Sequence, residues 1–323
     1  MKIFLTGGAG YIGSVTSEML LDAGHEVVIF DNLERGHLEA VDQRARFIKG
    51  DLRNREEILD AMGRAKPDAV VHFAAYALVG ESMEFPMRYF RNNVGGGVHL
   101  VEAMIENGVK KVIFSSTCAT YGQPDKMPMT EDIPQRPTNP YGESKLMLER
   151  IMLWEHERHG LKPVFLRYFN ACGATEKFGE DHDPETHIIP NVLAVALGKK
   201  DKVSVFGDDY PTPDGTCIRD YIHIMDLAQA HILALTCDHV GAFNLGTGDG
   251  MSVKQVVDTA RKVTGHPIPV QVSARRPGDP ARLVAGAEKA KSILGWKPKY
   301  GDLQTIIQHA WNWHKAHPNG YSK

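Results

Sequence analysis

Hydrophobic residues in the first half of the chain alternate between short continuous runs and segments with helical spacing. The run KIFLT at 2–6 ends at glycine and is typical of a buried strand, and the helical pattern after it stops at Gly24. Repeated strand–helix units with nearly continuous apolar strands predict a parallel sheet covered on both faces. The further strands are expected at 25–31, 45–52, 69–75, 111–117 and 163–170, and the further helices near 53–63, 83–107 and 139–158.

This pattern predicts an α/β protein with a Rossmann-type doubly wound parallel sheet and a smaller C-terminal α/β lobe. A chain of 323 residues is long for one compact core and suits two packed parts. We therefore expect a nucleotide-binding domain at 1–170 and a second lobe at 171–323, with residues near 220–250 returning to the first domain.

A glycine-rich loop separates the first predicted strand from the first predicted helix. Gly7, Gly10 and Gly13 have the spacing G-x-x-G-x-x-G, and this context is the one a dinucleotide fingerprint requires. Glycine lets the backbone approach a pyrophosphate, and the helix N-terminus offers free N–H groups. Asp31 ends the second strand, where a carboxylate can bind the ribose hydroxyls of adenosine and repel a 2′-phosphate. The sequence therefore predicts NAD rather than NADP.

Tyr141 and Lys145 stand four residues apart in the segment NPYGESKLMLER. Asn139 is a good N-cap and Pro140 suits the first helical position, so the pair is expected on one face of a helix. A tyrosine with a pKa of about 10 is a poor base at neutral pH. A nearby ammonium group and a positive nicotinamide ring would favour the phenolate. Beside a dinucleotide site, the pair predicts acid–base chemistry.

Composition narrows the classes of function. Net charge is −3, with Lys and Arg spread along the chain, which argues against nucleic acid and anionic membranes as partners. No apolar run approaches the about 20 residues of a membrane helix, and the N-terminus does not resemble a secretory signal. The four cysteines lack the spacing of a metal or disulfide framework, so we expect them to be reduced in a cytoplasmic protein.

The glycine loop and the tyrosine–lysine pair resemble the extended short-chain dehydrogenase/reductase family, with Thr117 of SSTCATYG as the expected hydroxyl at the preceding strand end. The likeness extends over essentially the whole chain to the UDP-galactose/UDP-glucose 4-epimerases. Similar stretches include GGAGYIG, DNL at 31–33, YGESK, LRYFNACGA and RPGD at 276–279. The stretch at 206–231, FGDDYPTPDGTCIRDYIHIMDLAQAH, is the most specific because it lies outside the shared cofactor scaffold.

The resemblance implies two sets of site residues. Those for NAD are Gly7, Gly10, Tyr11, Ile12, Gly13, Asp31, Asn32, Asp51, Leu52, Phe73, Ala74, Ala75, Asn92, Ser115, Tyr141, Lys145 and Phe169. Those for the UDP-sugar are Thr117, Tyr141, Asn170, His187, Ile188, Phe206, Arg219, Tyr221, Arg276, Asp279 and Leu283. The forked donors of arginine suit a diphosphate, and the carboxylate of Asp279 suits ribose hydroxyls.

The implied reaction is oxidation followed by reduction at C4 of the sugar. Tyr141 takes the 4-hydroxyl proton while a hydride passes to NAD, the 4-keto sugar turns its other face, and both return. Thr117 would hydrogen-bond the 4-oxygen, and Lys145 would tune Tyr141 and hold the nicotinamide ribose. The resemblance also implies a homodimer through helices near 83–107 and 139–158. Leu283 stands where members restricted to glucose and galactose often carry tyrosine, which predicts room for an N-acetyl group.

Other functions stay open. A dehydratase or decarboxylase would need a carboxylate directly after Thr117, where the chain has Cys118 and Ala119. A 4-epimerase of UDP-pentoses or UDP-glucuronate and an NAD-dependent sugar-nucleotide reductase are closer alternatives. A non-catalytic nucleotide sensor would have no need of Tyr141 together with Lys145.

The segment EDHDPETH at 180–187 invites a metal site through Asp181, His182, Asp183 and His187. We expect a polar loop folding over the substrate and no metal, because hydride transfer of this kind needs none.

Overall fold

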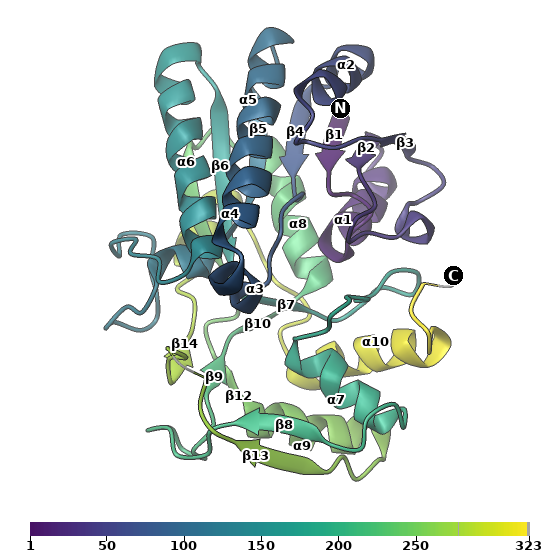
Figure 1. Ribbon diagram of the computed structural model, residues 1–323, viewed down its shortest axis with the longest axis vertical. Coiled ribbons are helices and arrows are strands. Elements are labelled where there is room, and N and C mark those ends of the chain that lie inside the picture. The colour runs from purple at the N-terminus through teal and green to yellow at the C-terminus, as the bar shows by residue number, and fades with distance from the viewer. Residues whose placement is uncertain (277, 322–323) are drawn as a thin grey trace.

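The computed structural model describes residues 1–276 and 278–321 (Figure 1). Within them, a seven-stranded sheet has the order β11-β6-β5-β4-β1-β2-β3, and every pair of neighbouring strands is parallel. Its strands are β1 Lys2–Thr6, β2 Glu26–Asp31, β3 Arg46–Lys49, β4 Ala69–His72, β5 Lys111–Thr117, β6 Lys162–Tyr168 and β11 Gly241–Leu245. The predicted fold class is confirmed.

Helices cover both faces of this sheet. Adjacent strand residues point to opposite sides, so Ile3 and Leu5 pack into one apolar core while Phe4 packs into the other. Helices α1 (Tyr11–Asp22) and α8 (Ile224–Leu235) contribute to the first core. Helices α2 (Arg55–Ala65), α5 (Gly96–Glu106) and α6 (Pro140–His159) contribute to the second. Figure 1 shows α5 and α6 side by side in front of the sheet.

The strand order reverses at β1, which lies between β4 and β2. Crossovers on the two sides of this point run over opposite faces, and the loops at the carboxyl ends of β1 and β4 diverge there. Ligands of open α/β sheets bind at such a position. The glycine loop follows β1 directly, so the topology places it at the switch point.

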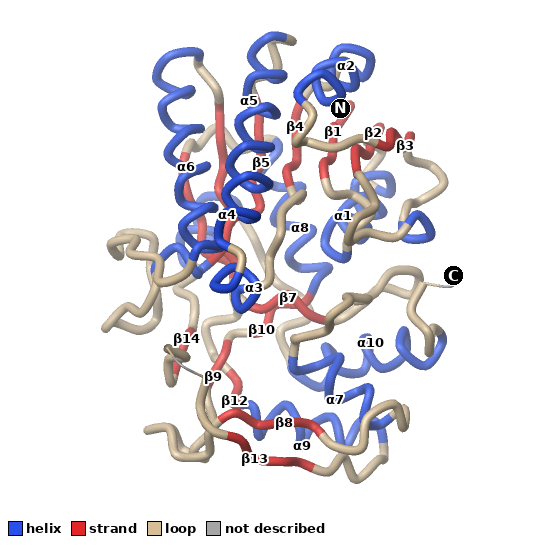
Figure 2. The backbone as a smooth tube through the Cα atoms, in the orientation of Figure 1, coloured by secondary structure: helices blue, strands red, loops and turns tan. Residues whose placement is uncertain are grey.

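A smaller part lies at the carboxyl end of the sheet, drawn below it in Figures 1 and 2. Its core joins apolar residues of three helices, and short strands pair around it. The helices are α7 Ile188–Ala196, α9 Val253–Thr264 and α10 Leu303–Ala316. The strand pairs are β7 Asn170–Cys172 with β10 Tyr221–His223, and β8 Val203–Phe206 with β13 Val270–Ser273. A third sheet contains β12 Met251–Ser252, β9 Ile218–Arg219 and β14 Arg282–Leu283.

The single long helix expected near 83–107 is wrong. The structure has α3 at Val79–Glu84, α4 at Pro86–Tyr89, a π-helical segment at Phe90–Gly95 and then α5. Pro86 stands at the first helical position of α4, because its ring and missing N–H stop α3 before it. The interruption turns Asn93 inward, where its side chain bonds the backbone of Tyr76.

Two strand predictions were too long. β3 ends at Lys49 and β4 at His72, and the polar residues after them form loops at the carboxyl edge of the sheet. The strand expected at 163–170 divides into β6 and the start of β7. In the described part of the chain, no helix has the length and apolar character needed to cross a bilayer.

Candidate active site

The glycine loop is folded tightly against the neighbouring strand. Gly7 has φ +74°, and a Cβ atom there would lie 2.5 Å from the backbone nitrogen of Ala74. A Cβ atom at Gly13 would lie 2.2 Å from the carbonyl oxygen of Gly7. Gly10 is the N-cap of α1 and provides no side-chain cap, which leaves first-turn N–H groups available to a ligand. This arrangement fits a pyrophosphate.

Asp31 is buried at the end of β2 beside this loop. Its carboxylate accepts hydrogen bonds from the backbone N–H groups of Ala9 at 3.1 Å and Leu33 at 2.8 Å. Burial raises the pKa of Asp31, and these two hydrogen bonds oppose the rise. The carboxylate thus ties the glycine loop to β2 and stands where the ribose of a dinucleotide would lie.

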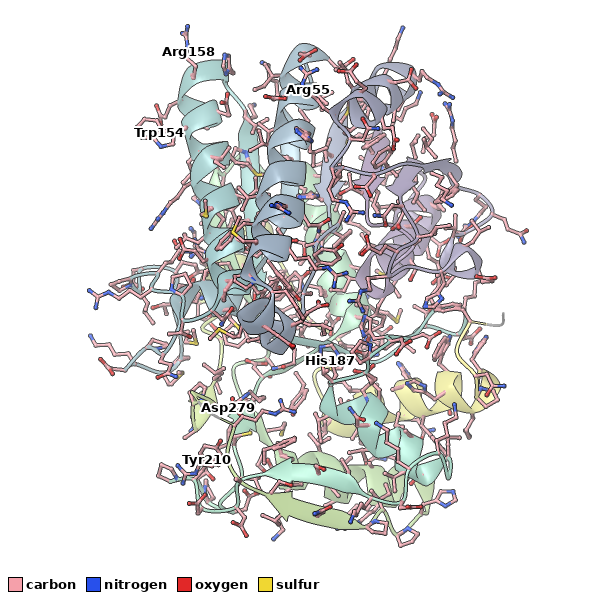
Figure 3. The ribbon with its side chains drawn as sticks, in the orientation of Figure 1. Arg55, Trp154, Arg158, His187, Tyr210 and Asp279 are labelled. Atoms are coloured by element: carbon pink, nitrogen blue, oxygen red, sulfur yellow. The ribbon has the colours of Figure 1, made fainter. Side chains whose placement is uncertain are left out.

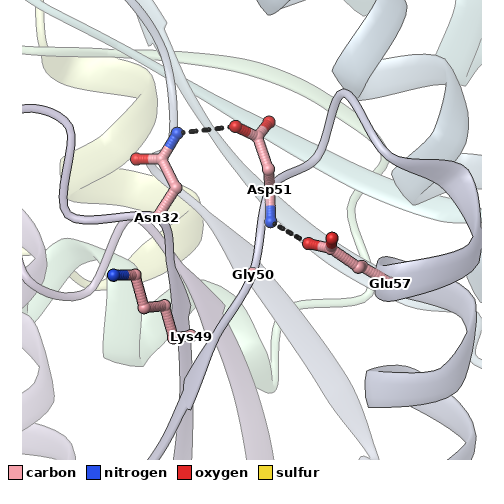
Figure 4. A pocket seen from close by; sticks show the side chains of 5 residues that line it. All are labelled: Asn32, Lys49, Gly50, Asp51 and Glu57. Carbon is pink, nitrogen blue, oxygen red and sulfur yellow. Dashed lines mark hydrogen bonds between the residues drawn. The ribbon is translucent and has the colours of Figure 1, made fainter.

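A polar cavity of about 260 Å³ opens beyond Asp31 (Figure 4). Its lining is Asn32, Lys49, Gly50, Asp51 and Glu57. The Asn32 amide donates to Asp51 at 3.0 Å, and the backbone N–H of Asp51 donates to Glu57 at 2.8 Å. Asn32 and Asp51 were expected here from the sequence. Lys49 and Glu57 were not expected, because no motif marks them. Only the fold brings Lys49 at the end of β3 and Glu57 of α2 to this cavity.

The other residues expected at NAD collect at the same edge of the sheet. Phe73, Ala74 and Ala75 directly follow β4, Ser115 lies near the end of β5, and Phe169 follows β6. The rest are Leu52 after β3, Asn92 in the π-helical segment, and Tyr11 and Ile12 in the first turn of α1. The Tyr11 hydroxyl donates to the Gly173 carbonyl at 2.7 Å, so its side chain reaches the segment that leads to α7.

Tyr141 lies in the first turn of α6. The Asn139 side chain accepts from the backbone of Gly142 at 2.8 Å, as the predicted N-cap requires. A Cβ atom at Gly142 would lie 2.5 Å from the Ala119 carbonyl oxygen, so the helix begins tightly against the end of β5. Burial raises the pKa of Tyr141 to about 12, and a hydrogen bond with Thr117 opposes that rise. The structure therefore brings Tyr141 and Thr117 together.

Lys145 is buried one turn further along α6. Its ammonium donates to the Ser115 carbonyl at 2.8 Å and lies 4.8 Å above the Phe114 ring. Burial lowers the pKa of Lys145 to about 7, against the opposing charge of Glu149. In the chain alone, desolvation of the tyrosine dominates its pKa, and the predicted effect of the ammonium together with the nicotinamide ring stays a prediction. The chain's own residues leave the phenol protonated at neutral pH.

A buried ion pair supports this part of α6. Arg167 of β6 donates from Nε to Glu149 at 2.9 Å and from Nη1 to the Tyr121 hydroxyl at 2.9 Å. The Ser116 hydroxyl of β5 donates to the same carboxylate at 2.5 Å. The network ties α6 to both strands beneath Tyr141. Nothing in the sequence singled out Glu149 or Arg167.

The charged residues expected at the UDP-sugar lie around β8, β9 and β14. Arg219 forms an ion pair with Asp279 and donates to the Ile218 carbonyl at 2.7 Å. The guanidinium of Arg276 lies 4.1 Å from the centre of the Phe206 ring. Two cationic groups and one carboxylate therefore converge here. Figure 3 labels Asp279 between the two parts of the molecule.

Asp220 has a structural role that the sequence did not suggest. Asp220 is fully buried, and its side chain accepts from backbone N–H groups. These belong to Thr247 at 2.7 Å, Gly248 at 3.0 Å and Ala285 at 3.1 Å. The Asp220 carbonyl accepts from the Asn170 amide at 2.9 Å, and Tyr221 is buried in β10. The turn that presents Arg219 is thus held rigidly.

Leu283 lies opposite Arg219 in the pairing of β14 with β9. It is partly buried and packs against an apolar cluster that extends to the cofactor edge of the sheet. The cluster contains Tyr121, Met129, Phe169 and Ala285, with Cys118 also packed against it.

His187 and Ile188 lie at the start of α7. The imidazole of His187 is directed to carboxylates of its own segment, with Nδ1 2.8 Å from Glu180 and 3.1 Å from Glu185. The side chain of His187 therefore contacts carboxylates of its own loop.

Comparison with known proteins agrees with this geometry. Residues 3–246 match the model of the NAD dependent epimerase/dehydratase family. A UDP-glucose 4-epimerase of Halalkalibacterium halodurans is 54% identical over 331 residues, covering 100% of this chain and 98% of that protein.

Solved structures are similar over the same extent. The UDP-glucose 4-epimerase from Brucella ovis in complex with NAD has a TM-score of 0.94 and 46% identity, covering 96% of this chain and 97% of that chain. The UDP-Glc/GlcNAc 4-epimerase from Campylobacter jejuni has a TM-score of 0.88 and 39% identity, covering 98% and 99%. By its sequence, its fold and the residues gathered at the switch point, this chain belongs to the NAD dependent epimerase/dehydratase family, and within it to the UDP-glucose 4-epimerases.

Proposed function

We propose that this chain interconverts UDP-galactose and UDP-glucose, by NAD-dependent oxidation to a 4-keto sugar and re-reduction. The observation that carries the proposal is a partly buried Tyr141 beside Thr117, close to a glycine loop suited to a dinucleotide. The chain shares its full length with proteins named for this reaction.

The residues present fit NAD. The first turn of α1 suits the pyrophosphate, Asp31 the adenosine ribose, and the cavity at Asn32 the adjoining base. Lys145 stands near the end of β5, where it can hold the nicotinamide ribose. When bound, NAD supplies a hydride acceptor and donor beside the reacting sugar carbon.

Tyr141 is the proposed acid and base. In the oxidation it takes the proton of the 4-hydroxyl, and in the reduction it returns that proton to the 4-oxygen. Positive charge next to the phenol must first offset the cost of burial, since a pKa of about 12 leaves it protonated. Thr117 holds the 4-oxygen through its hydroxyl, and the side chain itself is held because Oγ1 accepts from the Ala119 N–H at 3.1 Å.

The UDP group is assigned to the far side of the site. Arg276 and the N–H groups of Arg219 not used by Asp279 suit the diphosphate, and Asp279 suits the ribose of the uridine. Anchoring the nucleotide there leaves the sugar attached through one linkage, so it can turn its opposite face to the cofactor.

Identification of the bound nucleotide tests the proposal directly. Purified protein is denatured, the released nucleotide is identified, and turnover is measured with UDP-hexoses, UDP-pentoses and UDP-glucuronate. We expect NAD and the fastest turnover with UDP-galactose. Release of NADH during turnover would indicate a reductase instead, and a preference for pentoses or glucuronate would reassign the substrate.

Removing the charge of Asp31 should weaken NAD more than NADP. Asp31→Asn keeps one acceptor oxygen, so it can accept from only one of the backbone N–H groups of Ala9 and Leu33, which now bond separate carboxylate oxygens. It also loses the charge-assisted bond to the ribose and the repulsion of a 2′-phosphate. We expect the Kd of NAD to rise about tenfold to a hundredfold, with a smaller change for NADP. Calorimetric titration of nucleotide-free protein measures both, with the exposed Asp60→Asn as control. Equal losses for both nucleotides would contradict the ribose assignment.

We also propose that UDP-N-acetylhexosamines are substrates, because Leu283 is smaller than tyrosine and lies opposite Arg219. Leu283→Tyr should lower turnover of UDP-N-acetylglucosamine about tenfold to a hundredfold and leave UDP-galactose largely unaffected. Leu283→Met, which conserves volume, is the matched control. The idea fails if the unmodified protein does not convert the N-acetylated sugars at millimolar concentration.

Three further assignments belong to this proposal. A homodimer through α6 and the α3–α4 region is supported by exposed apolar side chains there, including Trp154, which is 76% exposed (Figure 3). Free cysteines at all four positions support a cytoplasmic location. The division into a cofactor domain at 1–170 and a substrate lobe after it is supported by α8 and β11, which rejoin the sheet from 224–245.

A further inference from the structure

Four side chains of the segment between β7 and α7 gather around a common centre. They are Glu180, His182, Glu185 and His187, and one ligand atom of each lies within 4.8 Å of all the others. Glu180 Oε1 lies 2.8 Å from His187 Nδ1 and 3.2 Å from His182 Nδ1. Glu185 closes the group, with its oxygens 3.1 Å from His187 Nδ1 and 3.6 Å from His182 Nδ1.

Two of these atoms lack hydrogen bonds in spite of the short distances. Glu180 is only 5% exposed, and within residues 1–276 and 278–321 neither its Oε1 nor Nδ1 of His182 has a hydrogen-bond partner. A buried carboxylate oxygen without a partner is costly, and such an atom calls for an explanation. Both atoms point into the group, so a cation at its centre would satisfy them together.

The spacing matches a tetrahedral metal site. Bonds of about 2.0–2.1 Å from zinc to histidine nitrogen and carboxylate oxygen place neighbouring ligand atoms about 3.3 Å apart. The separations between histidine nitrogens and carboxylate oxygens, from 2.8 to 3.6 Å with both oxygens of Glu185 counted, lie on both sides of that value, and one ligand atom of each residue lies within 4.8 Å of the others. Two imidazole nitrogens and two carboxylate oxygens are ligand types that zinc accepts, and the two carboxylates balance its charge.

The alternative is a partly buried network of ion pairs, in which the side chains of His182 and His187 are 33% and 45% exposed. It would need both imidazoles protonated with their rings 5.4 Å apart, so that two positive groups face each other in a small space. Only the contact of His187 with Glu185 has hydrogen-bond geometry among those between the histidines and the carboxylates of this group. Shared coordination of one cation explains the short distances without requiring hydrogen-bond alignment.

We propose that Glu180, His182, Glu185 and His187 bind one Zn²⁺ ion. Four protein ligands close the coordination shell, which makes the site structural. The metal would fix the segment that begins α7. Asp181 and Asp183 were expected from the sequence among the possible ligands, but neither belongs to this group. The carboxylate of Asp181 accepts instead from the backbone N–H of Tyr321 at 3.0 Å. His187, expected at the substrate, becomes a metal ligand, and the loop that was expected to hold no metal holds one.

Metal content and thermal stability test this site without any assay of activity. Full-length protein purified without chelator should contain about one zinc per chain by elemental mass spectrometry. Removal by a strong chelator should lower Tm by roughly 5 °C, and Zn²⁺ but not Mg²⁺ should restore it. Protein reconstituted with Co²⁺ should show the intense visible absorption of tetrahedral coordination.

Variants separate coordination from general electrostatics. His187→Gln and Glu185→Gln should each retain about a tenth or less of the zinc. His159→Gln, which removes a histidine–carboxylate pair on the surface of α6, should retain all of it. If His187→Gln or Glu185→Gln does not fold, the cobalt spectrum of the unmodified protein shows whether the site coordinates a metal. Folded protein that neither contains nor takes up zinc, and whose Tm a chelator does not change, would overturn the proposal.

Discussion

Tyr141→Phe is expected to lower kcat for UDP-galactose at least about a hundredfold, the usual scale for loss of an acid–base group. The substitution removes only the hydroxyl, which is the atom proposed to carry the proton between the 4-oxygen and the enzyme. The ring still packs where it did, nearly perpendicular to the Tyr89 ring. The fold and the bound nucleotide should therefore be unaffected.

The measurement compares single-substrate kinetics with the nucleotide content of the same preparation. Thr117→Val is the matched variant, because it removes the hydroxyl that bonds Tyr141 and conserves the volume of the side chain. We expect Thr117→Val to lower kcat by a smaller factor than Tyr141→Phe, since the Thr117 hydroxyl positions the 4-oxygen and does not transfer the proton. Near-normal turnover of Tyr141→Phe with a full complement of NAD would exclude the proton-transfer role.

Arg167→Met is expected to lower the free energy of unfolding by about 3–5 kcal/mol. The substitution removes the ion-pair partner of Glu149, which lies on the catalytic helix α6 and is 2% exposed. It also removes the donor to the Tyr121 hydroxyl. Because a buried charge without a partner is far more costly than a missing pair, the double variant Arg167→Met with Glu149→Leu should recover part of the loss.

Urea denaturation followed by circular dichroism measures these differences. The control is Arg158→Met on the same helix, whose side chain is exposed at the end of α6 (Figure 3). It should change the midpoint by little, as surface substitutions usually do. If Arg167→Met were no more destabilising than Arg158→Met, the ion pair would have no part in holding α6 against the sheet.

Local features of the site were predictable from the sequence. The strand, glycine loop and helix at the N-terminus depend on contacts between residues close in the chain, and Gly7 and Gly13 have no room for a side chain. The start of α6 depends on Asn139 and Pro140 at its own first turn. Such signals are short-range, so the pattern of residues was enough to place Tyr141 on a helix beside a dinucleotide site.

The resemblance to a family identified further site residues, but it did not predict which side chains surround them. Arg219 and Asp279 were assigned to the substrate separately, whereas the structure pairs them with each other. His187 was assigned in the same way, yet its ring is directed to Glu180 and Glu185. A motif names a residue type at a position, and it does not specify which side chains surround that residue.

The tertiary structure alone decided the interactions that join distant segments. Glu149 and Arg167 meet because α6 packs on β6, and Asp220 meets the backbone at Thr247 because β11 returns to the sheet. The pKa of Tyr141 also follows from packing, since desolvation depends on everything that surrounds the hydroxyl. The sequence by itself determined the order of elements and the chemistry of the short motifs. Burial and charge pairing were decided by the folded chain, because both arise from contacts that have no fixed spacing along it.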